Sequence, residues 1–272
     1  MLRGLLMMIL VGGVVGYGNL IFKSLEMIRD HSYKYGVDDS HNHKHSSEVL
    51  HFVSEINMNY YDRKRMNILI LSALYHDVID GKYMKFDKTK KMNILYDYVE
   101  KLDLGRYRLD IFENVWFIIN NMSYSKTVIV DENNEPRYNE FEFIKKYENR
   151  DIYDLVRNAD LISSYNLKRA FDYSIYKDNI DIDTITYENI NDIYKEVEDL
   201  YRRRMHKLRK NNILTLSNVR CDKLSRELDL RAFLKLTTYV SSDNYSSVQK
   251  HFDMYPKIEI ENIIKHFKEK TI

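Results

Sequence analysis

The sequence predicts an all-α protein, a helical bundle with one short insertion and further helices toward its C-terminus. Only 2 prolines and 8 glycines occur in 272 residues, which favours long helices over a succession of tight turns. Hydrophobic residues make up 44% of the chain, and they recur at helical spacing in most segments. The single cysteine, Cys221, excludes an internal disulfide framework and a cysteine-rich zinc module.

The first half of the chain has the pattern of five helices with polar breaks between them. The break GVDDSHNHK at 36–44 is rich in histidine and separates the first helix from the second. The stretch NILILSALYH at 67–76 is apolar on nearly every face, which indicates a helix buried on most sides. The predicted helices are Leu20–Tyr35, His45–Ile56, Asn67–His76, Met92–Leu102 and Asp110–Met122.

The second half begins with an insertion and continues with longer helices. The turn-rich sequence TVIVDENNEPRYN at 127–139 favours a short hairpin. One apolar stripe runs through Ile152–Phe171 and predicts a single helix, whereas the polar stretch Tyr173–Glu188 predicts a loop. Further helices are expected at Ile190–Lys210, Asn218–Val240 and Ile258–Lys270.

The apolar N-terminal segment is considered apart from the bundle. Residues 5–22 are apolar except for Asn19, and about 18 such residues are a marginal length for a membrane span. The segment is a membrane anchor, a targeting peptide or a helix that packs on the domain. We therefore expect residues 1–19 to form this segment, 20–240 a single domain and 241–272 a C-terminal helical appendage. The expected location is the cytoplasm, and membrane association through residues 5–22 is the alternative.

Ionisable side chains occur where the predicted helices should be buried. His45 shares a helical face with the apolar positions one to three turns further along its helix. Asp160 falls on the apolar stripe of the 152–171 helix. His76 and Asp77 end the most apolar helix of the chain, which should carry both side chains into the interior. Burying these groups is costly unless each is paired or bound to a cation.

Two imidazoles and two carboxylates on three inward-facing segments can bind one divalent cation. Taken alone, a buried aspartate such as Asp160 could simply pair with Arg157 or Arg169. The joint occurrence instead favours a shared cation, which compensates the cost of burying all four groups. Nitrogen and carboxylate ligands without thiolate suit one divalent transition metal, Mn first, with Fe, Co, Ni or Zn as alternatives.

The order and local context of these residues resemble the HD-domain superfamily of metal-dependent phosphohydrolases. The resemblance covers residues 20–240, and its strongest motifs are LSALYHDVIDGKY around His76-Asp77 and LVRNADLISSY around Asp160. The stretch SHNHKHSSEVL resembles the opening of the family, with Asn42 and Glu48 where the family has an aspartate and an arginine. WFIINNMSYSK at 116–126 and the segment 206–238 resemble nucleotide pyrophosphohydrolase-like members.

The resemblance implies a fold, a ligand set and a reaction. The fold would be an HD-domain-like helical bundle, with His45, His76, Asp77 and Asp160 as metal ligands. The cation would activate a water molecule and polarise a phosphoryl oxygen. Asp80, three residues beyond Asp77, is the candidate for orienting or deprotonating that water, with Asp77 beside it. The candidate substrate contacts are Lys82, Asn121, Ser123 and Lys126, and His41 is the candidate support for a metal ligand.

The expected substrate is a small phosphorylated molecule, a nucleotide or a related phosphoester or phosphoanhydride. HDVID followed by VRNAD is also similar to the alarmone hydrolases, which remove the 3′-pyrophosphate of guanosine tetraphosphate. Asp80-Gly81 would replace the acidic pair of those enzymes, so one acid is missing. A third possibility is a degenerate HD-type module that binds a nucleotide or a protein without turnover. The presence of all four ligands counts against this third possibility.

Nucleic acid is not an expected partner. The chain has 42 Lys and Arg against 41 Asp and Glu, a net charge of +1, which gives no general attraction to a phosphate backbone. The basic stretch YRRRMHKLRK at 201–210 predicts an amphipathic helix with a solvated basic face that could also contact phosphate. The sequence carries no signal for an oligomeric state.

Overall fold

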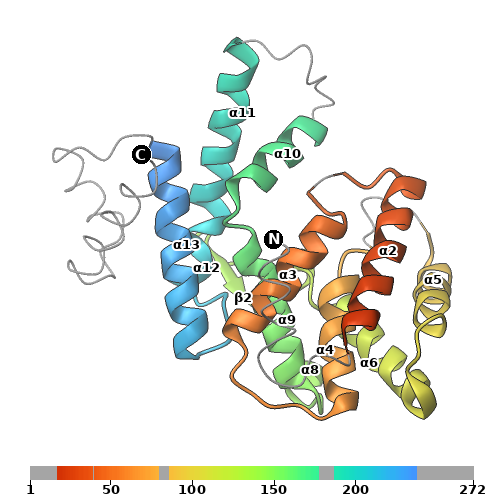
Figure 1. The fold of residues 1–272 in the computed structure, drawn as a ribbon. Helices are drawn as coiled ribbons and strands as arrows, with labels where there is room; N and C mark the ends of the chain where they lie inside the picture. Colours follow the sequence, from red (N-terminus) through yellow and green to blue (C-terminus); the bar gives the residue numbers. More distant parts are fainter. Residues whose placement is uncertain (1–16, 39, 80–85, 178–186, 238–272) are drawn as a thin grey trace.

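The computed structural model describes residues 17–38, 40–79, 86–177 and 187–237, and these form a helical bundle with one small hairpin (Figure 1). The all-α prediction is therefore confirmed. Residues 1–16, Asp80, Lys82 and the expected appendage at 241–272 lie outside the described residues. Within the described ranges, no helix combines the length and the apolar character needed to cross a bilayer.

The helices of the first half begin at polar caps. Asn42, Asp62 and Asp87 each accept a hydrogen bond from a backbone N–H in the first turn, which satisfies a donor that the helix leaves free. The first helix ends at Gly36, which has the left-handed conformation typical of helix ends. All five predicted helices are present: α2 (Gly18–Tyr35), α3 (His43–Ile56), α4 (Arg63–Tyr75), α5 (Lys88–Glu100) and α6 (Arg108–Asn121), with the 3₁₀ turn η2 (Gly105–Tyr107) before α6.

Helix α4 lies at the centre of this half. Every residue from Asn67 to Tyr75 is buried, as the nearly uniform apolar pattern predicted. α4 contacts α2, α3 and α6, and both α3 and α4 pack against a later helix, α9 (Arg150–Ser163) (Figure 1). Because α4 is enclosed on all sides, its C-terminal end and the residues that follow it are held inside the bundle.

The second half packs around its own hydrophobic cluster. Its buried members include Tyr165, Tyr201 and Phe233, which come from segments far apart in the sequence. α10 packs against α11, and the π-helical turn joins α11 to the next short helix. The elements are α10 (Leu167–Lys177), α11 (Tyr187–Leu200), the π-helical turn η4 (Tyr201–Met205), α12 (Lys207–Lys210) and α13 (Val219–Thr237).

The predicted single helix over 152–171 is wrong, because the chain turns between α9 and α10. The backbone N–H of Ser164 and the Ser164 hydroxyl both donate to the Leu161 carbonyl, and the hydroxyl distance is 2.6 Å. Capture of that carbonyl by a serine side chain competes with continuation of the helix. The predicted loop over 173–188 is also partly wrong, because α10 continues to Lys177 and α11 begins at Tyr187.

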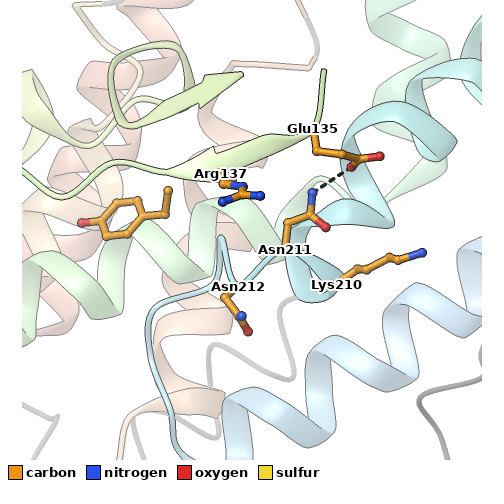
Figure 2. A pocket seen from close by; sticks show the side chains of 6 residues that line it. Glu135, Arg137, Lys210, Asn211 and Asn212 are labelled. Atoms are coloured by element: carbon orange, nitrogen blue, oxygen red, sulfur yellow. Dashed lines mark hydrogen bonds between the residues drawn. The ribbon is translucent and has the colours of Figure 1, made fainter. Parts of the chain in front are cut away.

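The insertion forms the expected hairpin. Val128 pairs with Tyr138 across the two antiparallel strands. Glu135 accepts hydrogen bonds from Lys207 at 2.6 Å and from Asn211 at 2.9 Å, which ties the hairpin to α12. Figure 2 shows the surface pocket beside this contact. The elements of this region are α7 (Tyr124–Thr127), β1 (Val128–Val130), β2 (Pro136–Tyr138) and α8 (Glu142–Lys145).

His31 should make the stability of the bundle depend on pH. Its ring is buried, and Nδ1 lies 2.7 Å from the Tyr98 hydroxyl of α5. Burial lowers the pKa of His31 from 6.5 to about 4, so between these values the unfolded chain binds a proton that the folded protein does not. This group should therefore remove about 3 kcal/mol of unfolding free energy as the pH falls from 6.5 to 4.

The test compares His31→Phe with the wild type by urea unfolding at pH 7 and at pH 4.5. Phenylalanine fills a similar space but cannot bind a proton, so the variant should lose less stability on acidification. Equal losses in the two proteins would show that His31 does not set this pH dependence.

Candidate metal centre

Three helices bring the predicted ligands together. His45 lies in the first turn of α3, His76 directly follows α4, and Asp160 lies on α9. One ligand atom from each of these residues falls within 4.8 Å of the others, although their positions span 115 residues of sequence (160 − 45). The packing of α3 and α4 against α9 creates this convergence. These three side chains could hold a metal ion.

Asp77 lies beside this trio. Its Oδ2 is 3.2 Å from His76 Nε2 and 3.4 Å from His45 Nε2. Asp160 Oδ1 lies at similar distances on the same nitrogens, 3.6 Å and 3.4 Å. The two Nε2 atoms are themselves 2.9 Å apart. All four predicted ligands therefore point their donor atoms at one small region.

The imidazoles are enclosed, whereas the carboxylates reach solvent. The side chains of His45 and His76 are 0% and 1% exposed, while those of Asp77 and Asp160 are 16% and 22% exposed. The cluster is thus open on its carboxylate side.

The hydrogen bonding of His76 prepares it to bind a cation. Its Nδ1 lies 2.9 Å from the Ala73 carbonyl one turn earlier in α4. A carbonyl only accepts, so Nδ1 must carry the hydrogen and donate it. The lone pair of the neutral ring is then on Nε2, the atom that faces the cluster. The backbone of α4 therefore fixes both the tautomer and the direction of this ligand.

The electrostatics of the cluster favour a bound positive charge. Burial and Arg169 both lower the pKa of His45, but hydrogen bonds with Asp160, Asp77 and Glu48 outweigh them and bring it to about 9. Burial raises the pKa values of Asp77 and Asp160, yet their contacts with the two histidines hold both below the usual range. The carboxylates therefore favour a protonated His45, and a cation can replace that proton.

The donor set fits a transition metal. Two imidazole nitrogens and two carboxylate oxygens are the ligands that Mn, Fe, Co, Ni and Zn accept. Closed thiolate coordination is excluded, because Cys221 is buried on α13 and belongs to the apolar core. The coarse prediction of a metal-binding cluster is therefore supported by the geometry.

A second layer of groups surrounds His45. Glu48 Oε2 lies 3.9 Å from its Nδ1, and Asn166 donates to the other oxygen of Glu48 at 2.8 Å. Arg169 Nη1 lies 2.8 Å from the same Nδ1 and donates to the Ser163 hydroxyl at 2.5 Å. Sequence reasoning gave Glu48 no role, although its spacing of three residues from His45 on one helix was a usable signal.

Asn42, one of the two sequence departures near His45, has a structural role, and His41 lies close by. Asn42 is the N-cap of α3, because its side chain accepts from the Lys44 backbone N–H at 2.8 Å. The ring of His41 lies 6.2 Å from that of His45, and its Nδ1 is 2.6 Å from the Ser40 hydroxyl. His41 is thus adjacent to a ligand, and its supporting role stays a prediction.

The predicted substrate contacts show other hydrogen bonds. The Asn121 side chain donates to the Phe117 carbonyl at 2.7 Å, and Lys126 Nζ donates to the Asn120 carbonyl. The Ser123 hydroxyl lies 3.5 Å from that of Ser125. None of these contacts is with the metal cluster, so a substrate role for Asn121, Ser123 and Lys126 stays a prediction. Asp80 and Lys82 lie outside the described residues.

Arg157, one of the two arginines suggested as partners of Asp160, makes its hydrogen bonds elsewhere. Arg157 is fully buried, and its Nη1 donates to the Ile213 carbonyl at 2.9 Å. Its Nε donates to Thr127 at 3.2 Å, and its guanidinium covers the Tyr138 ring at 4.2 Å. Arg157 therefore joins α9 to the hairpin and to the segment before α13.

Comparisons with known proteins found no match to a family model, to a curated protein or to a solved structure. The metal centre is therefore supported by the positions of its own side chains.

We expect the purified protein to bind Mn²⁺ at about one equivalent, and Asp77→Ala and His45→Ala to lose it. Each substitution removes one of four ligands and leaves the other carboxylate or imidazole unbalanced. Metal content after dialysis and titration calorimetry measure the change. His51→Ala is the matched control, because His51 is also on α3 but its ring contacts Phe52. A wild-type protein that stays free of metal after incubation with Mn²⁺ would contradict this assignment.

Proposed function

We propose that this protein is a metal-dependent phosphohydrolase that acts on a nucleotide or a related phosphoester or phosphoanhydride. The observation that carries the proposal is the convergence of His45, His76, Asp77 and Asp160 from three helices, with their carboxylates toward solvent. A structural metal site is usually enclosed by its ligands, whereas a catalytic one keeps a position open. The partly exposed carboxylates support the catalytic alternative.

Some residues of this site would hold a cation, and others would orient or deprotonate the attacking water. A divalent cation in this cluster would supply an activated water and neutralise charge on a phosphoryl oxygen. His76 would bind it in an orientation set by the Ala73 carbonyl. Asp77 stays ionised, since its contacts with histidine lower its pKa, and it can orient the water. We assign the transfer of the proton from that water to Asp80.

The test measures release of phosphate or pyrophosphate from a panel of nucleotides with added Mn²⁺, and the panel includes guanosine tetraphosphate. Asp160→Ala should lower the rate at least about a hundredfold, because loss of a ligand disorders the whole site. Asp151→Ala is the matched control, since Asp151 lies on the same helix but pairs with Arg65 at 2.5 Å. Circular dichroism checks that both variants fold.

The outcomes separate the alternatives that the sequence left open. Hydrolysis that persists in Asp160→Ala would show that the site is assigned wrongly. A strong preference for guanosine tetraphosphate over ordinary triphosphates would identify an alarmone hydrolase. Nucleotide binding without turnover in the manganese-loaded wild type would identify a binding module instead.

A further inference from the structure

Two arginine side chains lie beside the metal centre and have no carboxylate partner among the described residues. Arg169 is in the first turn of α10, and Arg204 is in the π-helical turn η4. Arg202, on the same turn as Arg204, instead donates to Glu198 at 2.7 Å. A partly buried guanidinium group is stabilised by a counter-charge. Arg169 and Arg204 therefore offer positive charge and hydrogen-bond donors to an anion at this site.

The guanidinium group of Arg204 lies over an aromatic ring and within electrostatic reach of Asp160. Its guanidinium lies 4.0 Å from the centre of the Tyr124 ring. Its Nε is buried, and no hydrogen-bond acceptor among the described residues reaches it. Burial lowers the pKa of Arg204, and Asp160 and Arg169 are among the nearby charges that act on it. Arg204 thus combines an unsatisfied donor with a charge that interacts with Asp160, a predicted metal ligand.

The π-helical turn explains why Arg204 differs from its neighbours. The backbone N–H of His206 donates to the Tyr201 carbonyl five residues earlier, which widens the helix locally. Arg202 and Arg203 on this turn are exposed, whereas Arg204 is half-buried. The regular amphipathic helix expected from the sequence would present these arginines as one solvated basic face. In the structure, with one extra residue in the turn, one of them is instead half-buried.

Arg169 has guanidinium donors that an anion could engage. Its Nη1 lies 2.8 Å from His45 Nδ1 and donates to the Ser163 hydroxyl at 2.5 Å. His45 Nδ1 carries a hydrogen both in the protonated ring and in a ring whose Nε2 holds a cation, so it accepts no hydrogen bond from Arg169 in either state. The carboxylate of Glu48, 3.9 Å from Nδ1, is the acceptor suited to that hydrogen. Arg169 therefore keeps the Ser163 hydroxyl as an acceptor and has further donors on its guanidinium group.

We infer that Arg169 and Arg204 bind the phosphate oxygens of the substrate beside the metal centre. The inference rests on the proposed function, because it names the groups that would receive a phosphorylated substrate there. Guanidinium groups suit this role, since their planar donors match two phosphate oxygens and their charge persists at all working pH values. Two of them favour a substrate that carries more than one phosphate group.

The experiment measures binding of inorganic pyrophosphate to the manganese-loaded protein by titration calorimetry. Arg169→Gln and Arg204→Gln should each weaken the pyrophosphate affinity about tenfold or more, because each removes a charged hydrogen-bond donor. Lys168→Gln and Arg202→Gln are the matched controls, since both are exposed neighbours on the same elements. Their affinities should stay within about twofold of the wild type.

Metal content in each variant separates two roles for the arginines. The arginines could instead only offset the charge of the carboxylates. In that case the two glutamine substitutions would change the Mn²⁺ affinity but leave the pyrophosphate affinity of the manganese-loaded protein unchanged. That result would overturn the inference. Arg204→Lys tests the same point in a variant that keeps its charge, and it should retain part of the affinity.

Failure of this inference and failure of the hydrolase proposal give different results. Wild-type-like pyrophosphate binding in both glutamine variants, or none in the loaded wild type, would overturn the inference whether or not nucleotides are hydrolysed. Arginine-dependent binding in a protein that hydrolyses no nucleotide would support the inference and contradict the hydrolase proposal.

Discussion

The burial of two imidazoles against two carboxylates is the constraint on which the site depends. Charged groups lose hydration inside a protein, and they remain ionised there only when opposite charges compensate them. Hydrogen bonds with carboxylates raise the pKa of His45 to about 9 although its side chain is fully enclosed, so the carboxylates favour a positive charge between them. This preference links the packing of α3, α4 and α9 to the chemistry, because the helices that form the core also bring the four groups together.

The fold supplies rigidity where the site needs it. α4 is buried along its length from Asn67 to Tyr75, so the position of His76 is determined by the core. Its orientation is determined by the Ala73 carbonyl of the same helix. The carboxylate side is built differently, because the side chains of Asp77 and Asp160 are partly exposed. A site with a fixed buried half and an accessible half can hold an ion firmly and still admit a ligand.

Sequence reasoning predicted the parts of this structure that periodicity determines. The apolar pattern located α2 to α6, and the shared face of His45 with its apolar neighbours placed that histidine inside. It missed the break after Ser163, because the apolar stripe continues through it and only a serine hydroxyl ends the helix. It also missed the π-helical turn, since one inserted residue leaves an amphipathic pattern almost unchanged. The partners of Arg157 lie in the hairpin and in the segment before α13, which have no periodicity to predict.

The charges around the cluster suggest an order of events at the site. Three carboxylates, those of Asp77, Asp160 and Glu48, face two guanidinium groups, and a proton on His45 brings the group to balance. A neutral site has no net attraction for a phosphate group. Exchange of that single proton for a divalent cation leaves one net positive charge in a partly buried cluster, where electrostatic attraction is stronger than in water. Cation binding would therefore create the charge that an anionic substrate requires, so substrate should follow metal.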